Sequence, residues 1–189
     1  SAHANTSNAD GIQIAEGMCA LVEKATGVAA SDVVVASTGV IGQPLCLDPI
    51  ANAMDVLAQG LSYEGSANAA QAIMTTDTIS KEIAVEFTVG GKTCRIGGIA
   101  KGSGMIHPNM ATMLVFITTD CAIAPHMLKK ALSHDIANTF NMLSIDGDTS
   151  TNDMVTVMAN GMAGNAPIDA EGEDFTVFMK ALNSLTIAL

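Results

Sequence analysis

The chain has 189 residues and a mass of 19.3 kDa, enough for one domain with its own core. Hydrophobic residues make up 49% and charged residues 14%, which excludes a disordered chain. The formal net charge of −11 disfavours binding to nucleic-acid phosphates. No uninterrupted apolar stretch is long enough to span a membrane, and the polar N-terminus does not resemble a signal peptide.

The first part of the sequence predicts three helices and one strand, on the basis of apolar periodicity and capping residues. Gly27 is typical of a helix end, while Asp48 and Pro49 are typical of a helix start. The β-branched run at 33–35 indicates a buried strand that leads into a glycine-rich turn. The predicted elements are helices over residues 8–26, 47–61 and 66–74, and a strand over 32–37.

The second part predicts a β-hairpin, a third strand and three helices. Gly90-Gly91 lies between two strand-like segments and indicates a two-residue hairpin turn. Ser150 and Asp153 have the spacing of a capping box, which predicts a helix directly after them. The predicted strands cover residues 83–89, 92–99 and 112–119, and the predicted helices cover 125–142, 155–162 and 174–189. These blocks indicate a layered α+β fold or a two-sheet sandwich covered by helices.

The isolated reactive residues have ordinary structural interpretations. No two cysteines have metal-ligand or redox spacing, so we expect free thiols at Cys19, Cys46, Cys94 and Cys121. His126 and His134 are more than two helical turns apart, which is too far for a shared ion and typical of a solvated helix face. We expect surface carboxylates at Asp10, Asp55 and Asp135. Nothing points to a paired-carboxylate hydrolase.

Two loops partly match ligand-binding motifs. In the glycine-rich segment 97–104, Lys101 precedes Gly102 instead of following it, so the order required for a phosphate loop is absent. The segment that begins at Asp146 lacks the glycine and glutamate of a calcium loop, and a helix-capping turn explains it better. The sequence predicts no metal site.

The junction at Ala111 and Thr112 is chemically more informative. A threonine hydroxyl is a weak nucleophile, but a threonine at the start of a chain can use its own α-amine as the base. That amine has a pKa of about 8 in model peptides, which suits proton transfer near neutral pH. Thr112 could reach this state only by cleavage of the Ala111–Thr112 bond; otherwise it is an ordinary β-branched strand residue. Thr38 and Gly39, in a tight turn, could supply oxyanion donors or could simply form a turn.

Four segments carry a resemblance to a known family. The long segment 101–114, Lys-Gly-Ser-Gly-Met-Ile-His-Pro-Asn-Met-Ala-Thr-Met-Leu, resembles the self-cleavage segment of the ornithine acetyltransferases, also called bifunctional glutamate N-acetyltransferases. Three further segments agree in order, at 37–42 (Ser-Thr-Gly-Val-Ile-Gly), 74–78 (Met-Thr-Thr-Asp-Thr) and 146–153 (Asp-Gly-Asp-Thr-Ser-Thr-Asn-Asp). The likeness extends over nearly the whole chain.

The resemblance implies a set of site residues. The precursor would cut itself between Ala111 and Thr112, and Thr112 would become the N-terminal nucleophile. Thr38 and Gly39 match the oxyanion-hole pair of the family. Thr75, Lys101 and Thr112 match substrate-contacting positions, with Thr75 preferred over Thr76 by spacing. Lys101 would meet a substrate carboxylate as a point charge.

The resemblance also implies a reaction and an assembly. The reaction is a ping-pong transfer of an acetyl group from N-acetylornithine to glutamate in arginine biosynthesis, and some members also accept acetyl-CoA. No cofactor is implied, and neither is a nucleic-acid or membrane partner. The implied fold is α+β, with two stacked β-sheets between helix layers, in an αββα arrangement of the self-processing N-terminal-nucleophile type. The mature enzyme would be an α2β2 heterotetramer in the cytoplasm, or in the mitochondrial matrix of a eukaryote.

The chain is about half as long as the members of that family. We therefore expect residues 1–111 to be the C-terminal part of the α chain and residues 112–189 the N-terminal part of the β chain, in one structural domain. Further glutamate, asparagine and serine or threonine contacts of the family have no matching position here. We accordingly predict little transferase activity from these 189 residues alone. The alternatives are an aminopeptidase or amidase with the same nucleophile, and a non-catalytic structural protein.

Overall fold

A computed structural model describes residues 9–39, 42–104, 113–147 and 152–189. The chain forms two compact units, Ser1–Gly65 and Ser66–Leu189. The sequence predicted one structural domain with a cleavage junction between residues 111 and 112. That junction belongs to the second unit by position and lies outside the described residues.

The first unit contains helices α1 (Gly11–Thr26) and α2 (Asp48–Gln59), which confirms both helices predicted there. Gly27 ends α1 with a φ of 77°, a left-handed conformation that favours glycine. Gly17 allows a close approach, because a Cβ at this position would lie 2.7 Å from Leu47 Cδ1. Small size at Gly17 therefore lets α1 pack against the segment that enters α2.

The strand predicted over residues 32–37 does not form within the described part of the chain. A short 3₁₀ helix, η2 (Ala30–Asp32), occupies its start, Val33 has extended backbone, and residues 33–37 belong to no strand. The Cys19 thiol lies 3.8 Å from the Val33 carbonyl oxygen. The valine-rich run favoured extended backbone, but a strand also needs a neighbouring strand to bond with.

The second unit is built on one four-stranded sheet with the order β1-β2-β3-β4. The strands are β1 (Lys81–Val89), β2 (Lys92–Lys101), β3 (Leu114–Thr119) and β4 (Met154–Ala159). Neighbours β1, β2 and β3 are antiparallel, and β4 pairs parallel to β3. Gly90 and Gly91 have φ values of 55° and 76°, which the predicted two-residue hairpin turn requires.

Strand β4 corrects the helix predicted over residues 155–162. The sequence Met-Val-Thr-Val-Met-Ala is rich in β-branched residues, and it pairs with β3 from Leu114↔Met154 to Thr119↔Ala159. The capping-box spacing of Ser150 and Asp153 was therefore misleading. The Asp153 side chain accepts a hydrogen bond from the chain that enters β3, as described below.

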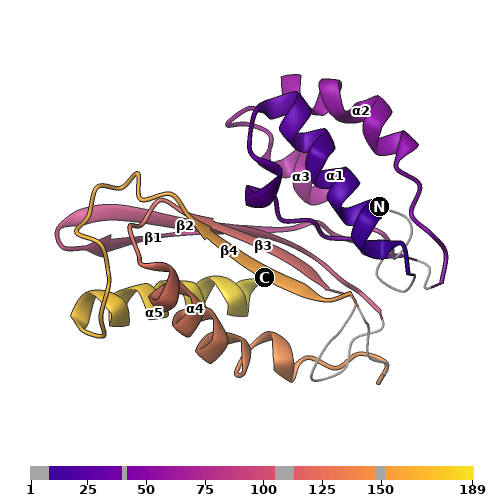
Figure 1. Cartoon of the computed structure of the whole chain (residues 1–189). Coiled ribbons are helices and arrows are strands. Elements are labelled where there is room, and N and C mark those ends of the chain that lie inside the picture. The colour runs from indigo at the N-terminus through magenta and orange to yellow at the C-terminus, as the bar shows by residue number, and fades with distance from the viewer. Residues whose placement is uncertain (1–8, 40–41, 105–112, 148–151) are drawn as a thin grey trace. The chain divides into compact units, whose positions relative to one another are not determined.

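Among the described residues, three α-helices accompany the sheet. Helices α4 (Pro125–Ile136) and α5 (Glu173–Ala188) lie on one face, as Figure 1 shows, and α3 (Ser66–Ala72) contacts β1 and β2. The helix predicted over residues 125–142 ends earlier, and η3 (Phe140–Met142) forms its last part. The core between α5 and the sheet contains Val89, Ile96, Val115, Ile117, Phe178, Leu182 and Leu185. The α+β class is confirmed, and the described residues contain this one sheet.

Asp135 is buried, which corrects its interpretation as a surface carboxylate. Only 2% of the residue is exposed. Its Oδ1 accepts a hydrogen bond from Asn183 Nδ2 at 2.8 Å, and its Oδ2 accepts one from the Thr186 hydroxyl at 2.7 Å. Asp135 therefore joins α4 to α5, and no signal within its own helix could reveal those partners.

The cysteines and the two helix histidines lie as the sequence predicts. All four cysteines are free thiols, with Cys94 and Cys121 buried and Cys46 exposed. His126 and His134 are exposed on α4, as expected for a solvated face. Within the described ranges, no helix has the length and apolar character needed to cross a membrane, and no group of three potential metal ligands occurs.

Candidate active site

Lys101, the last residue of β2, is a buried lysine at the edge of the described structure. It is 2% exposed and pairs with Leu114 at the start of β3. Burial lowers the pKa of Lys101, the negative charges of Asp77 and Asp153 raise it, and the positive charge of Lys81 lowers it; the balance is a pKa below the ordinary value. The predicted substrate contact Lys101 is therefore buried and is influenced by the charges of two carboxylates and one ammonium group.

Asp77 organises the segment between α3 and β1. Its side chain is fully buried, and its Oδ1 accepts hydrogen bonds from Lys81 Nζ at 2.6 Å and from the Gly102 N–H at 2.7 Å. Burial raises the pKa of Asp77, but the hydrogen bonds from Lys81, Gly102 and Thr75 lower it, with a net pKa below the usual aspartate value. Asp77 is therefore held as a charged carboxylate that ties two loops together.

The two threonines before Asp77 have different contacts. The Thr75 N–H donates to Asp77 Oδ2 at 3.3 Å. The Thr76 hydroxyl and the Ser103 hydroxyl form a hydrogen bond of 2.7 Å. Both threonines are exposed, and the preference for Thr75 as the substrate contact stays a prediction.

The start of β3 is fixed by the residues that enter β4. Asp153 Oδ1 accepts the Met113 N–H at 2.7 Å, and the Met154 N–H donates to the Met113 carbonyl oxygen at 2.9 Å. Met113 is the residue that follows Thr112 in the sequence. Thr112 and Ala111 themselves lie outside the described residues. Asp153 thus holds the strand on the carboxyl side of the predicted nucleophile.

The predicted oxyanion residues belong to the first unit. Thr38 is 5% exposed, and Gly39 has a φ of 148°. A φ in this range favours glycine, so the backbone at this position is one that a side chain would strain. Residues 40 and 41 of the predicted turn lie outside the described residues, and the role of Thr38 and Gly39 as an oxyanion hole stays a prediction.

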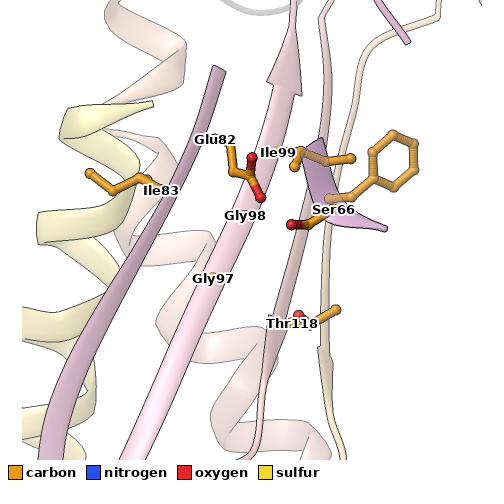
Figure 2. A pocket seen from close by; sticks show the side chains of 8 residues that line it. Ser66, Glu82, Ile83, Gly97, Gly98, Ile99 and Thr118 are labelled. Atoms are coloured by element: carbon orange, nitrogen blue, oxygen red, sulfur yellow. The ribbon is translucent and has the colours of Figure 1, made fainter. Parts of the chain in front are cut away.

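A separate hollow of about 260 Å³ lies on the sheet of the second unit. Figure 2 shows the side chains of Glu82, Ser66 and Thr118 around the part of β2 that Gly97 and Gly98 leave without side chains. Ile83, Ile99 and Phe116 complete the lining. None of the predicted catalytic or substrate-contacting residues lines this hollow.

Comparison with known proteins decides the family. The sequence profile of the ArgJ family matches residues 1–189. The chain belongs to the ArgJ family. This confirms the family recognised from the cleavage-segment and turn motifs.

Curated ArgJ proteins from several bacteria resemble the chain closely. The arginine biosynthesis bifunctional protein ArgJ of Symbiobacterium thermophilum is 48% identical over 192 residues, which cover 98% of this chain and 48% of that protein. The protein of the same name from Caldanaerobacter subterraneus is 49% identical over 172 residues, covering 91% of this chain and 43% of that protein. The chain thus spans about half the length of the curated relatives that it matches.

A solved ArgJ structure is also similar. The crystal structure of the arginine biosynthesis bifunctional protein ArgJ from Bacillus halodurans has a TM-score of 0.51 and 40% sequence identity, and the match covers 58% of each chain. This likeness agrees with the α+β class.

Sequence reasoning missed two carboxylates, Asp77 and Asp153, that bond to the segments of the candidate site. Asp77 stands inside a motif that carried the resemblance, but its partners are backbone N–H groups whose positions depend on the fold. Asp153 has the sequence spacing of a helix-capping residue, but in the structure it accepts the Met113 N–H. The spacing of Asp77 two residues after Thr75 is visible in the sequence, but the spacing does not reveal that Asp77 is buried or which groups it bonds.

Proposed function

We propose that this chain carries the nucleophile of a bifunctional ArgJ enzyme, which transfers an acetyl group from N-acetylornithine to glutamate. The observation that carries the proposal is the family match over all 189 residues, which includes the segment around Ala111 and Thr112. The relatives share the name arginine biosynthesis bifunctional protein, which supports a role in arginine biosynthesis. Because the chain spans about half of their length, the activity belongs to the complete protein.

Self-cleavage would generate the nucleophile. The Thr112 hydroxyl oxygen attacks the Ala111 carbonyl carbon, the peptide C–N bond breaks, and the Thr112 nitrogen takes the proton. Water then hydrolyses the resulting ester, which frees the Ala111 carboxylate and the Thr112 hydroxyl. The new α-amine of Thr112 is the general base for later steps. Asp153 would hold Met113, and with it the start of β3, during these steps.

Acetyl transfer would follow in two halves. The Thr112 amine takes the hydroxyl proton as the oxygen attacks the acetyl carbonyl of N-acetylornithine, and the ornithine amine leaves with that proton. The amine of glutamate then attacks the acetyl-threonine ester, forming N-acetylglutamate and restoring the hydroxyl. Thr38 and Gly39 would stabilise the oxyanion in both halves.

Substrate binding would use charge. Lys101 as an ammonium group would bind the α-carboxylate that N-acetylornithine and glutamate share, and Thr75 would contact the same substrates. Burial lowers the pKa of Lys101, and the nearby charges of Asp77 and Asp153 oppose that shift and so favour the ammonium form. The shared carboxylate explains how one site could serve both the donor and the acceptor.

Several finer properties belong to the same proposal. Acetyl-CoA is a further donor to be tested, and the cleaved chains would associate as α2β2. The enzyme would work in the cytoplasm, or in the mitochondrial matrix if the source is a eukaryote.

The decisive assay uses a full-length ArgJ protein that contains this sequence. We expect N-acetylornithine plus glutamate to yield N-acetylglutamate, and Thr112→Ala to abolish the product. Thr88→Ala, which changes an exposed threonine of β1, is the matched control and should retain activity. Release of free acetate at a rate independent of glutamate would instead indicate an amidase. Full transfer by Thr112→Ala would exclude Thr112 as the nucleophile.

A further inference from the structure

A buried carboxylate joins the segments that contain Thr75 and Lys101, which an exposed hydrogen bond between the Thr76 and Ser103 hydroxyls also connects. Asp77 accepts the N–H of Thr75 on Oδ2 and the N–H of Gly102, the residue after Lys101, on Oδ1. The Gly102 contact joins positions 25 residues apart in the sequence. The Asp77 carboxylate is therefore a fixed point from which both segments take their positions.

Both Asp77 oxygens are occupied, and this makes the position sensitive to small chemical changes. Lys81 Nζ shares Oδ1 with the Gly102 N–H, and the Asp77 side chain is 0% exposed. An asparagine would place an NH₂ group against an N–H donor or against the Lys81 ammonium, because an amide has only one acceptor oxygen. A buried donor facing another donor is unfavourable, so the two loops would shift apart.

The same carboxylate acts on the charge of Lys101. The charged groups that affect Lys101 come from three segments: Asp77 before β1, Lys81 on β1, and Asp153 before β4. The two carboxylates favour the charged form of Lys101, and Lys81 opposes it. Replacing Asp77 and replacing Lys81 should therefore change the titration of Lys101 in opposite directions.

We propose that Asp77 is a positioning residue for substrate binding, which sets the spacing between Thr75 and Lys101 and thereby the affinity for the substrate α-carboxylate. This inference rests on the proposed function. Asp77 does not touch the reacting atoms in this account, so it should affect KM far more than kcat, and it should leave self-cleavage before Thr112 intact.

The test compares Asp77→Asn, Lys81→Met and Ser103→Ala in the full-length protein. For Asp77→Asn we expect the KM for N-acetylornithine to rise roughly tenfold or more, the effect of losing a hydrogen bond to a charged group, with kcat little changed. Ser103→Ala removes the exposed Thr76–Ser103 bond between the same two segments and leaves Asp77 in place. It therefore tests which of the two contacts sets their spacing, and we expect a near-wild-type KM.

The pH profile separates positioning from a general loss of structure. In Asp77→Asn the alkaline limb of kcat/KM should move to lower pH, because a negative charge near Lys101 is lost. In Lys81→Met it should move to higher pH, because a positive charge near Lys101 is lost. A damaged fold would not produce shifts of opposite sign.

The outcomes distinguish this inference from the function on which it rests. A wild-type protein without transferase activity contradicts the proposed function. An active wild type together with an unchanged KM in Asp77→Asn overturns the positioning role. If Asp77→Asn does not fold, Asp77→Glu retains the charge and displaces the carboxylate. We then expect a raised KM with an unshifted alkaline limb, and a wild-type KM would overturn the inference.

Discussion

The buried carboxylate of Asp135 gives the sharpest test of how the second unit is held together. Asp135→Ala removes hydrogen bonds from Asn183 Nδ2 at 2.8 Å, Thr186 Oγ1 at 2.7 Å and Thr139 Oγ1 at 3.3 Å. The two threonine hydroxyls keep backbone acceptors, Thr186 with the Leu182 carbonyl oxygen at 3.1 Å and Thr139 with the Asp135 carbonyl oxygen at 2.9 Å. The main loss is therefore the Asn183 amide partner and the charge-assisted bond to Thr186.

These contacts set the expected magnitude. A hydrogen bond to a charged group contributes about 1.5–3 kcal/mol, and part of the gain offsets the cost of burying the charge. We therefore expect Asp135→Ala to lower the free energy of unfolding by about 2–4 kcal/mol. For a chain of this length, that corresponds to a fall in Tm of roughly 5–15 °C.

The assay combines urea unfolding with hydrogen exchange of the α5 amides, because exchange in α5 reports on the second unit alone. Asp169→Ala is the matched control, since Asp169 is an exposed carboxylate of the same unit. We expect the control to stay within about 0.5 kcal/mol of the wild type, as surface substitutions usually do. An Asp135→Ala variant as stable as the control would refute the view that this carboxylate joins α4 to α5.

Three further predictions concern other parts of the molecule. Burial raises the pKa of Cys121 to about 12. At pH 8 an alkylating reagent should therefore label the exposed Cys46 in the native protein and label Cys121 only after unfolding, as peptide mass spectrometry would show. Labelling of Cys121 in the native protein would disprove its burial. The folded-state pKa of Asp77 is lowered, so its contribution to stability is present above the unfolded pKa and is lost as pH falls through the folded pKa. The free energy of unfolding should therefore fall less steeply with decreasing pH in Asp77→Asn than in the wild type. The same pH dependence in both proteins would contradict this. Asp153→Ala removes the acceptor of the Met113 N–H, so self-cleavage of the full-length protein should slow, as the cut fraction over time would measure; an unchanged rate would count against this contact.

Local sequence signals predicted the elements whose causes are local. Alternating apolar residues and Gly90-Gly91 predicted the β1–β2 hairpin, because a period of two and a two-residue turn are properties of one short segment. Pro125 and the apolar stripe predicted α4 in the same way, although the helix ends at Ile136. Where the period and the turn chemistry agree, the structure follows them.

The failures arose where a distant partner determines the outcome. Residues 154–159 form β4 because they pair with β3, and the residues at 32–37 lack such a partner among those described. Asp135 is buried by side chains of α5, about fifty residues away in the sequence. Pairing and burial of this kind depend on tertiary contacts, which no window of the sequence contains.

Some predicted site residues lie in the described part of the second unit, and others lie outside the described residues or in the first unit. The motifs identified Thr75 and Lys101, and the structure brings their segments together through Asp77. The predictions for Ala111 and Thr112 concern residues outside the described ranges, and they stay predictions. Thr38 and Gly39 belong to the other unit, so their catalytic role also awaits experiment.

The most direct test of the account is the intact mass of a purified, catalytically active, full-length protein under denaturing conditions. The account predicts two chains, one that ends at Ala111 and one that begins with Thr112. Edman sequencing or tandem mass spectrometry would place the boundary, and Thr112→Ala should remain a single chain. A wild-type protein that transfers acetyl groups while its Ala111–Thr112 bond is intact would contradict the central claim that Thr112 is an N-terminal nucleophile.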